Sequence, residues 1–473
     1  MPTFYIAQFG CRAAQADGAA LERQLRERGC TAATEAAAAD VVVVNTCTVT
    51  AAADSQARDA IRKIHARNPA ARVIVTGCYA QRAPEELAAL PGVSWVVGNS
   101  HKPQIPQIFD AFSLHDAPSS GNGFVSVQAL GSSSALEADA MSLERAPAKI
   151  LTGDIFEQAY FLSAPILGGE GNHTRPILKI QDGCDSRCSY CVIPFVRGKS
   201  RSLPADRVIA EIQRLSASGY REIVLSGINL GTYGRDLSPR VEFDDLLRRI
   251  LDETSVERLR VSSIEPLDVT RDLIALFAST GRIAQHFHMP LQSGSDRILA
   301  AMHRWYRAEH YARRVELIRE HLPHAAIGAD VIAGFPGETE TDHADTLAFI
   351  ERLPFTYLHV FSFSKRPGTR AAARLDELPA AVIQRRARAL RALGEEKSAA
   401  FYRAQSGRSL QVLTLRHASR PAAPGWTPAI STNYLHVRVP GEWPPNQMIS
   451  ALLFSGGAHY LNARPETQEA FAV

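Results

Sequence analysis

The first hundred residues alternate between short apolar runs and helix-like stretches. The apolar runs at 4–9, 41–46 and 72–77 predict strands, and the stretches at 20–29 and 55–67 predict helices between them. Apolar strands that are joined by helices indicate a parallel sheet. In open sheets of this kind ligands bind beyond the carboxyl ends of the strands, so we expect a site of this region to lie there.

A second and longer alternation begins at residue 176. Helix-like stretches separate six strand-like runs, which lie at 176–181, 222–227, 258–266, 285–292, 325–335 and 357–364. Six such βα units predict a complete or partial barrel, with its active site over the carboxyl ends of the strands.

Between the two alternating regions the pattern breaks up into Pro, Ser, Gly and Ala, and the chain ends in short β-rich runs. We therefore expect an α/β protein with an N-terminal parallel-sheet domain at 1–105, a linker or insertion at 106–170, a barrel at 171–405 and a small all-β domain at 406–473. A long helix at 379–405 carries arginines that we interpret as a solvated charged face rather than as RNA contacts.

The composition restricts the class of protein without identifying it. The 473 residues suffice for about three domains, and 45% hydrophobic with 21% charged residues excludes a disordered or fibrous chain. The net charge of +3 is too small to identify a nucleic-acid partner. The N-terminus does not resemble a secretion signal, and no apolar run approaches the roughly 18 residues of a membrane span, so we expect a cytoplasmic protein.

The chain has seven cysteines, and a reducing compartment disfavours structural disulfides between them. Cys11, Cys47 and Cys78 each follow one of the three predicted N-terminal strands, so a parallel sheet brings them to one rim. Cys30 follows Gly29 at a predicted helix end, and we expect it to be a buried structural thiol.

The strongest local signal is the run QDGCDSRCSYC, in which Cys184, Cys188 and Cys191 have the spacing C-x3-C-x2-C directly after the first barrel strand. Its chance occurrence in this chain is roughly two in a thousand. Thiolates are soft ligands for zinc or for iron–sulfur clusters. A structural zinc ion needs a fourth ligand such as His173, whereas a cubane cluster on three thiolates leaves one iron open for a substrate or cofactor.

This motif at the start of a βα barrel, with an aromatic residue before the last cysteine, resembles the radical S-adenosylmethionine superfamily. The resemblance implies that Cys184, Cys188 and Cys191 hold a [4Fe–4S] cluster whose open iron binds S-adenosylmethionine. It also implies that Tyr190 packs against the adenine of that cofactor. In the superfamily one electron from the cluster cleaves the sulfonium and generates a 5′-deoxyadenosyl radical.

Other strand ends are similar to the superfamily as well. The run SGINLG, which begins with Ser226 and Gly227, resembles the turn that receives the methionine amino group. The segment 328–339 resembles a later turn near the cofactor. Gln292 and Ser293 follow the fourth barrel strand, where they are either cofactor or substrate contacts or, as isolated polar residues, capping groups.

The N-terminal runs FGCRAAQ, NTCTVT and TGCYAQR are similar to the three cysteine segments of the methylthiotransferases. By that resemblance Cys11, Cys47 and Cys78 hold a second [4Fe–4S] cluster with one open iron, and the C-terminal region is a TRAM domain. A TRAM domain is an OB-like β-barrel associated with RNA binding, in which Tyr434 and Arg438 offer stacking and phosphate contacts. Taken alone, Tyr434 is instead expected to be an aromatic residue of the β core.

Within this family, the run NTCTVTAAADSQARDAIRK most resembles the MtaB-type branch, which acts on N6-threonylcarbamoyladenosine at position 37 of tRNA. The resemblance implies that a methylthio group replaces the hydrogen at carbon 2 of that adenine. One S-adenosylmethionine methylates sulfur at the N-terminal cluster, and a second is cleaved at the barrel cluster. Both clusters must then face one cavity, into which the adenine is unstacked. The chain departs from the family at Ala14, where asparagine is usual.

Several alternatives stay open at the level of sequence. The same chemistry fits isopentenyladenosine in tRNA or an aspartate of a ribosomal protein, and a zinc-stabilised RNA-binding protein or an electron-transfer protein belongs to another class. The resemblance implies the tRNA anticodon loop, an external electron donor and a sulfur donor as partners. We expect a monomer that binds no membrane.

Overall fold

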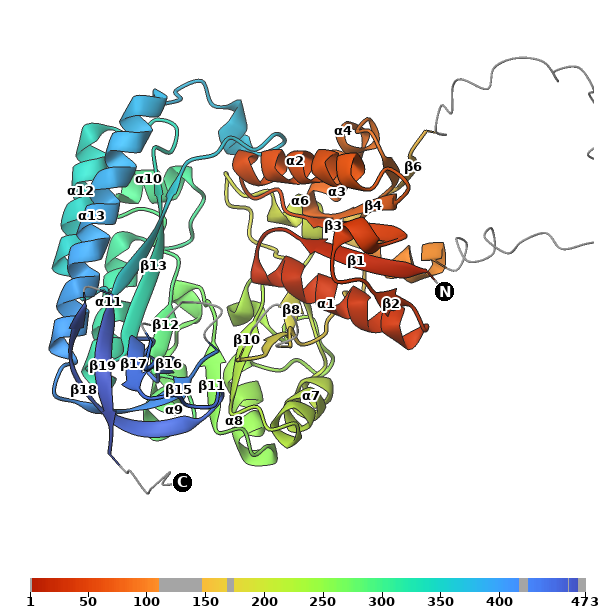
Figure 1. Ribbon diagram of the computed structural model, residues 1–473. Coiled ribbons are helices and arrows are strands. Elements are labelled where there is room, and N and C mark those ends of the chain that lie inside the picture. Colours follow the sequence, from red (N-terminus) through yellow and green to blue (C-terminus); the bar gives the residue numbers. More distant parts are fainter. Residues whose placement is uncertain (1, 110–146, 168–173, 417–423, 458, 467–473) are drawn as a thin grey trace, which may run out of the picture.

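The computed structural model describes residues 2–109, 147–167, 174–416, 424–457 and 459–466. Figure 1 shows an N-terminal α/β unit, a central α/β unit and a C-terminal β-barrel that packs on the central unit. This arrangement confirms the predicted fold class. None of the described helices is long and apolar enough to cross a membrane.

The N-terminal unit is a wholly parallel sheet with the strand order β2-β1-β3-β4-β5-β6. Its strands are β1 (Thr3–Gln8), β2 (Thr31–Ala32), β3 (Val41–Thr46), β4 (Arg72–Gly77), β5 (Val93–Gly98) and β6 (Lys149–Leu151). Its helices are α1 (Arg12–Glu27), α2 (Ala51–Arg67), α3 (Cys78–Arg82) and α4 (Pro84–Ala88). The strand order reverses between β1 and β3, and the crevice at the carboxyl end of such a switch point is where open α/β sheets bind ligands.

The N-terminal unit includes residues from the range 106–170, which the sequence predicts as a linker or insertion. Ile108 and Phe109 belong to its apolar core, together with Phe4. The strand β6 pairs with β5 at the edge of the sheet. A strand of three residues is too short to produce a recognisable period in the sequence.

The central unit contains the six predicted parallel strands, which form two sheets with the orders β11-β10-β7 and β12-β13-β14. An isolated parallel bridge between Leu259 and Ile283 connects the sheets into a partial barrel. The strands are β7 (Ile177–Lys179), β10 (Glu222–Ser226), β11 (Arg258–Val261), β12 (His286–His288), β13 (Ala326–Ala333) and β14 (Tyr357–Ser362), beside the short pair β8 (Gln181–Asp182) and β9 (Arg201–Ser202).

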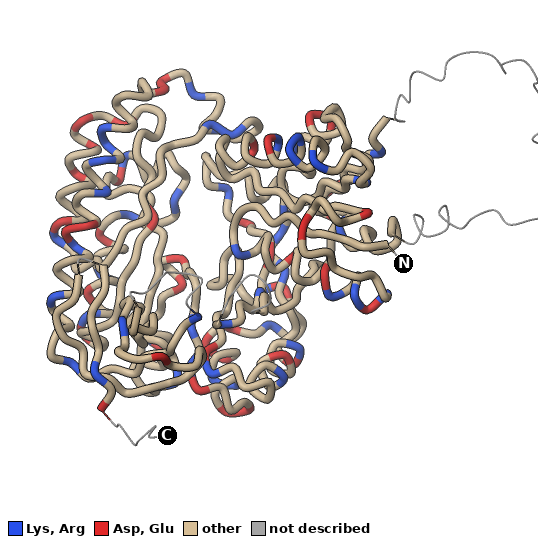
Figure 2. The backbone as a smooth tube through the Cα atoms, in the orientation of Figure 1, with Lys and Arg blue, Asp and Glu red and all other residues tan. Residues whose placement is uncertain are grey.

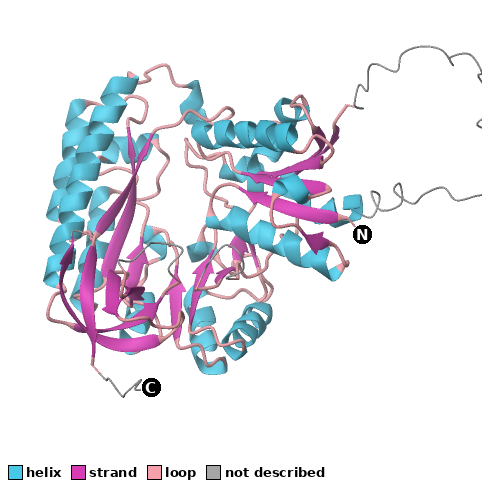
Figure 3. Cartoon of the chain, viewed as in Figure 1, coloured by secondary structure: helices cyan, strands magenta, loops and turns pink. Residues whose placement is uncertain are grey.

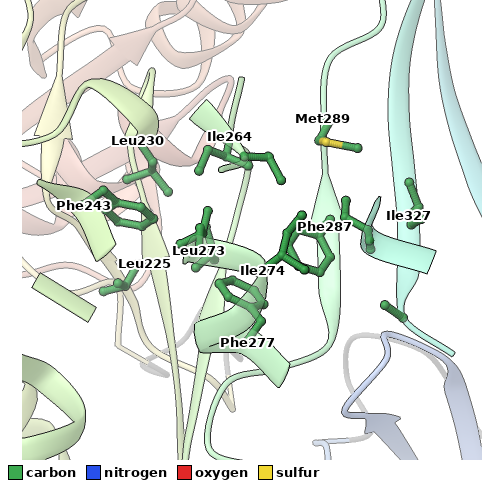
Figure 4. Close-up of a cluster of buried hydrophobic side chains, with 14 of the residues drawn as sticks. Leu225, Leu230, Phe243, Ile264, Leu273, Ile274, Phe277, Phe287, Met289 and Ile327 are labelled. Carbon is green, nitrogen blue, oxygen red and sulfur yellow. The ribbon is translucent and has the colours of Figure 1, made fainter. Parts of the chain in front are cut away.

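Helices cover the outer side of these strands, as Figure 3 shows. They are α7 (Ala205–Ala217), α8 (Phe243–Glu253), α9 (Arg271–Ser279), α11 (Ala308–His321), α12 (Glu340–Arg352) and α13 (Ala380–Ala404). Two short helices lie elsewhere: α6 (Ile193–Arg197) packs against α3, and α10 (Asp296–Ala301) contacts the loop that contains Ser189. The apolar core lies between the two layers (Figure 4), and there Phe277 stacks on Phe287 with ring centroids 4.6 Å apart. Because side chains alternate along a strand, His286 and His288 point to the opposite face, the inside of the barrel.

Five strands close the C-terminal barrel, which confirms the predicted all-β domain. They are β15 (Ser409–Thr414), β16 (Trp426–Ser431), β17 (His436–Pro440), β18 (Met448–Gly457) and β19 (Tyr460–Pro465). On the preceding helix α13, Arg385 and Arg386 pair with Glu340 at the start of α12. Figure 2 shows acidic and basic residues interspersed along these two helices. This supports the interpretation of the arginines as a charged face rather than an RNA site.

A buried ion network joins the N-terminal unit to the central unit. The carboxylate of Asp17, on α1, accepts hydrogen bonds from Lys102 at 2.8 Å, from Arg197 at 3.0 Å and from Lys179. Arg197 also donates two bonds of 2.8 and 2.9 Å to Asp182. Burial opposes ionisation of Asp182, but Arg197 and Lys179 lower its pKa to about 2. Both carboxylates are therefore charged at neutral pH.

A second contact ties the loop after β14 to the segment that follows β3. Arg366 donates to the Asp54 carboxylate at 2.7 Å and to the backbone oxygen of Thr48 at 3.2 Å. Arg82 donates to the same Asp54 oxygen at 3.1 Å. The two α/β units are thus attached at two places, one on each side of the junction between them.

Replacing Asp17 with asparagine tests the ion network. The variant leaves three buried cations with one carboxylate fewer, so we expect the free energy of unfolding at pH 7 to fall by about 3–5 kcal/mol. Urea unfolding followed by circular dichroism measures the loss. Asp59→Asn is the matched control, because Asp59 pairs with Arg62 on the surface. Equal losses in both variants would contradict a structural role of the network.

The network also predicts that the free energy of unfolding falls at acidic pH. Because the folded pKa of Asp182 lies below that of an unfolded aspartate, its contribution is complete above about pH 4. That contribution disappears as the pH falls toward the folded value of about 2. We expect wild type to lose stability over this window, and Asp182→Asn to lose less of it. An equal loss of stability in wild type and in Asp182→Asn over this pH range would contradict the role assigned to Asp182.

Candidate active site

Three cysteines converge at the carboxyl rim of the N-terminal sheet, as the sequence predicts. Cys11 follows β1 and begins the turn into α1, Cys47 follows β3, and Cys78 is the first residue of α3. A hydrogen bond with Cys47 lowers the pKa of the Cys11 thiol to about 5. Cys47 and Cys78 are buried, whereas Cys11 is exposed. The trio therefore borders the β1/β3 switch point and leaves one side accessible.

Glycines directly before two of these cysteines permit this convergence. Gly10 and Gly77 have φ values of 99° and 101°, in the left-handed region that disfavours side chains. A Cβ atom on Gly10 would lie 2.2 Å from the Cβ of Cys47, and one on Gly77 would lie 2.2 Å from the backbone oxygen of Thr46. Any other residue at position 10 would push Cys11 and Cys47 apart.

The second trio lies in the loop after β8, at the mouth of the partial barrel. Cys188 and Cys191 are joined by a backbone hydrogen bond of 3.1 Å, and the backbone N–H of Cys184 donates to the oxygen of Gly198 at 3.0 Å. Burial raises the pKa of Cys191 to about 12, and the charges of Cys188 and Cys184 add to the rise. The three thiols are therefore neighbours on one loop.

Contacts from Ser189 hold this loop in place. Its backbone N–H and hydroxyl donate to the backbone oxygens of Met302 at 2.9 Å and Ala301 at 2.8 Å, at the end of α10. Its backbone oxygen accepts from Ala371 at 2.8 Å. The cysteine loop is thus attached to two segments that lie more than a hundred residues further along the chain.

The two cysteine trios meet across the junction between the α/β units. Cys78 packs in one buried cluster with Val192 and Val196, which directly follow Cys191. Asn99 bridges the same junction, because its amide donates to the Cys78 sulfur at 3.5 Å and to the backbone oxygen of Val196 at 2.7 Å. Cys78 of one trio therefore lies at this junction, and Cys191 of the other directly precedes a residue that does.

Arg304 and Glu265 beside the barrel trio were missed at the level of sequence. Arg304 donates to the Cys188 sulfur at 3.4 Å and forms an ion pair with Glu265, which follows β11. Burial acts to lower the pKa of Arg304, but Tyr306, Tyr190 and Glu265 raise it well above its usual value, so Arg304 stays charged. An isolated arginine and glutamate, 39 positions apart, give no sequence signal of such a contact.

Three of the predicted cofactor contacts lie in the cysteine loop or close to it. Tyr190 packs against a buried cluster that includes Met302 and Phe335. Gly227 lies against Gln181, whose side-chain oxygen would be 3.0 Å from an added Cβ. Ser226 is buried beside it at the end of β10.

Gln181 was also missed, although it connects the two loops that the resemblance singled out. Its side-chain oxygen accepts from the backbone N–H groups of Ile228 and Asn229 at 2.9 and 2.8 Å. Its side-chain N–H donates to the backbone oxygen of Gly183 at 2.8 Å. The side chain thereby fixes the turn after β10 against the start of the cysteine loop.

The other two predicted contacts differ from each other. The hydroxyl of Ser293 is buried and engaged with Thr346 at 3.1 Å and with the backbone N–H of Ser295 at 3.2 Å, so it organises the turn after β12. Gln292 has a φ of 66° and bonds to β13 through its backbone. Its side-chain amide makes no hydrogen bond within the described part of the chain and stays a predicted contact.

The donor sets of both trios fit iron–sulfur clusters. Thiolates are the usual ligands of such clusters. A single zinc ion needs ligand atoms about 3–4 Å apart. Among the described residues, the group whose ligand atoms all lie within 4.8 Å is His288, Asp330 and His359, and neither cysteine trio is that tight. The predicted zinc ligand His173 lies outside the described residues.

The other residues that the sequence singled out, Cys30, Tyr434 and Arg438, each pack against neighbouring side chains. Cys30 is buried in the apolar core with Leu21 and Leu25, as expected for a structural thiol. Tyr434 stacks on His286 inside the barrel, with ring centroids 4.2 Å apart, and the Arg438 guanidinium lies 3.7 Å from the centre of the Tyr460 ring. Tyr434 is therefore engaged with the central unit rather than free for an RNA base.

Two family models match the chain. The model described as "Uncharacterized protein family UPF0004" matches residues 3–98, and the model of the "Radical SAM superfamily" matches residues 178–350. The two matches correspond to the N-terminal sheet and to the barrel, and each includes one cysteine trio.

Curated relatives match over most of the chain. A protein of Aquifex aeolicus named "Threonylcarbamoyladenosine tRNA methylthiotransferase MtaB" is 34% identical over 94% of this chain and 98% of its own. A Bacillus subtilis protein of the same name is 35% identical over 84% of this chain and 81% of its own. A Sphingopyxis alaskensis protein named "tRNA-2-methylthio-N(6)-dimethylallyladenosine synthase" is 33% identical over 98% of this chain and 97% of its own.

The fold has a solved counterpart in the radical S-adenosylmethionine methyltransferase TsrM from Kitasatospora setae, whose structure contains cobalamin and a [4Fe–4S] cluster. The TM-score is 0.54 at 16% identity, over 78% of this chain and 76% of TsrM. This likeness concerns the fold alone. The long matches to curated relatives, together with the two cysteine trios, show that the chain belongs to the radical S-adenosylmethionine tRNA methylthiotransferase family.

Proposed function

We propose that the protein converts N6-threonylcarbamoyladenosine at position 37 of tRNA to its 2-methylthio derivative. The observation that carries the proposal is the junction of the two α/β units, where Cys78 packs against the residues that directly follow Cys191. A reaction that needs a sulfur source and a carbon radical at one carbon atom requires two such centres in one cavity.

The cysteines have separate tasks in this proposal. Cys11, Cys47 and Cys78 hold one [4Fe–4S] cluster, and the C-x3-C-x2-C loop holds the other. The chemistry that these clusters and S-adenosylmethionine supply when bound is removal of a hydrogen atom from carbon 2 of adenine and delivery of a methylthio group. No side chain acts as a base on that hydrogen, because an unactivated aromatic C–H bond is too weak an acid.

The remaining residues position these ligands. Arg304 and Asn99 donate hydrogen bonds toward Cys188 and Cys78, and such bonds to ligand sulfurs tune the reduction potential of a cluster. Gln181 keeps the turn after β10 against the cysteine loop, where the resemblance places the methionine end of the cofactor. Tyr190 lies beside the same loop as a wall for the adenine of the cofactor.

The choice of substrate rests on the relatives named MtaB and on the polar inner face of the barrel. Relatives named for dimethylallyladenosine match at nearly the same identity, so identity alone does not separate the two substrates. The inward positions of β12, β13 and β14 carry His288, Asp330 and His359. These groups suit a polar substituent on the adenine better than an apolar one.

Further parts of the proposal follow from the reaction. An external electron donor and a sulfur donor must supply the two clusters, and the substrate is the anticodon loop of a tRNA in the cytoplasm. We propose that the protein acts as a monomer, because one chain contains both cysteine trios.

Iron content tests the assignment of the cysteines. We expect about eight iron atoms per chain in anaerobically reconstituted wild type, and about four in Cys47→Ala or Cys188→Ala, because each variant loses one cluster of four irons. Cys30→Ala is the matched control and keeps the wild-type value. Two zinc ions without sulfide in wild type, or full iron in both variants, would overturn the assignment.

The nucleosides of tRNA test the substrate. In a strain that lacks the gene, mass spectrometry should show loss of 2-methylthio-N6-threonylcarbamoyladenosine and accumulation of its precursor. Wild type and Cys30→Ala should restore the product, whereas Cys47→Ala and Cys188→Ala should not. The proposed substrate is rejected if this nucleoside is unchanged while another methylthio product is lost.

A further inference from the structure

Five polar and aromatic side chains form a connected group inside the barrel. The Tyr357 hydroxyl lies 2.8 Å from a ring nitrogen of His286 and 2.9 Å from one of His288. The other ring nitrogen of His288 lies 3.0 Å from Asp330 Oδ1, and His359 Nδ1 lies 3.3 Å from the same oxygen. We refer to these residues, His286, His288, Asp330, Tyr357 and His359, as the inner polar group.

The strand register explains why these residues share one face. His288 and Tyr357 both pair with Gly328, on β12 and β14, and Asp330 pairs with His359. Gly328 leaves space for the Tyr357 ring, since an added Cβ would lie 2.0 Å from one of its atoms. The group is therefore built on three paired strands and is rigidly placed.

The inner polar group has open sides as well as closed ones. Tyr434 stacks on His286 and covers one side of it. In contrast, the side chains of Asp330 and His359 are 26% and 55% exposed. In the described part of the chain, Asp330 Oδ2 and His359 Nε2 have no hydrogen-bond partner, and neither does the buried His286 Nδ1. Asp330 Oδ2 and His359 Nε2, on the two exposed side chains, are therefore available to a ligand.

Charged residues next to each cysteine trio interact electrostatically with the inner polar group. On the barrel side, burial raises the pKa of Glu265 and the charge of Asp330 contributes to the rise, and Glu265 is the partner of Arg304 at Cys188. On the other side, Arg12 follows Cys11. Burial lowers the pKa of His286, and Arg12 is among the cations that lower it further.

Arg12 itself is exposed and forms no ion pair in the part of the chain that the structure describes. An exposed guanidinium without an ion-pair partner is suited to a carboxylate. In the inner polar group, Asp330 Oδ2 accepts hydrogen bonds and the exposed ring of His359 donates or accepts them. Arg12 thus offers a cation, and the inner polar group offers an ionised carboxylate and an imidazole, each with a hydrogen-bonding atom that is free among the described residues.

We propose that Arg12, Asp330 and His359 form a subsite for a carboxylate-bearing, hydroxyl-bearing substituent on N6 of the substrate adenine. Arg12 binds the carboxylate, while Asp330 and His359 bind the hydroxyl and carbamoyl groups. Tyr357 is a positioning residue, because its hydroxyl holds His288, which in turn holds Asp330. This inference rests on the proposed function and deepens it.

The chemistry of the subsite discriminates between the two candidate substrates. A threonylcarbamoyl group supplies a partner for each of the three side chains. A dimethylallyl group supplies none, and it would remove water from an ionised carboxylate without replacing its hydrogen bonds. Sites that are built to bind polar groups reject analogues that lack them, because the site's own groups stay unpaired.

Binding of modified RNA to the reconstituted holoenzyme tests the inference. Fluorescence anisotropy gives the Kd for anticodon stem-loop RNAs whose adenine 37 carries threonylcarbamoyl, dimethylallyl or no substituent. We expect wild type to bind the first RNA about tenfold or more tightly than the second, the factor that a hydrogen bond to a charged group supplies. Asp330→Asn, His359→Gln and Arg12→Gln should each reduce this preference toward unity while leaving the Kd of the unsubstituted RNA unchanged.

Three controls make the result specific. Iron analysis establishes that each variant, Arg12→Gln above all, keeps both clusters. His321→Gln replaces a histidine on α11 that bonds to its own helix, and it should keep the full preference. Tyr357→Phe should weaken the preference only partly, because it removes the hydroxyl but none of the three binding groups.

Two outcomes would overturn the subsite. Equal affinity of wild type for the two modified RNAs, or full preference in all three variants, would do so without affecting the methylthiotransferase assignment, which the tRNA nucleosides test separately. A zinc or manganese ion that is retained by wild type and lost from His359→Gln would also overturn it, since His288, Asp330 and His359 would then be metal ligands.

Discussion

The structure depends on the buried contact of Arg197 with Asp17 and Asp182. Asp17 belongs to the helix that begins after Cys11, and Arg197 ends the short helix that follows Cys191. The same interaction that joins the two α/β units therefore fixes both cysteine trios relative to each other. Lys102 and Lys179 add further positive charge around the two carboxylates. Burial raises the pKa of Cys78, and Arg197 and Lys102 counteract that rise, so the network favours the thiolate form at the N-terminal trio.

Much of the fold could be predicted because the relevant patterns are local. The runs 41–46 and 72–77 coincide with β3 and β4, since buried parallel strands have uninterrupted apolar sequences. The edge strand β6 was missed because three residues provide no period. The cysteine positions could be placed at strand ends from the same pattern, and the switch point between β1 and β3 explains why they meet.

The rest of the site depends on contacts between distant residues, which leave no local signal. Arg304 reaches Cys188 across 116 positions, and Gln181 connects two turns 47 positions apart. Tyr434 looked like a nucleic-acid contact in a β-rich segment, but the C-terminal barrel docks on the central unit and places its ring on His286. Ser293 was a plausible cofactor contact by position, yet its hydroxyl serves the turn in which it lies.

In the proposed enzyme, the two cysteine trios form the cofactor side of the cavity, and Arg12 and the inner polar group form its substrate side. The central claim is that both trios hold clusters that open into this one cavity. The most direct measurement is an iron anomalous-scattering map from crystals of the anaerobically reconstituted enzyme. The account predicts two four-iron peaks, one among Cys11, Cys47 and Cys78 and one at the barrel loop, both bordering the cavity lined by His359. A single peak, or a second peak away from that cavity, would contradict it.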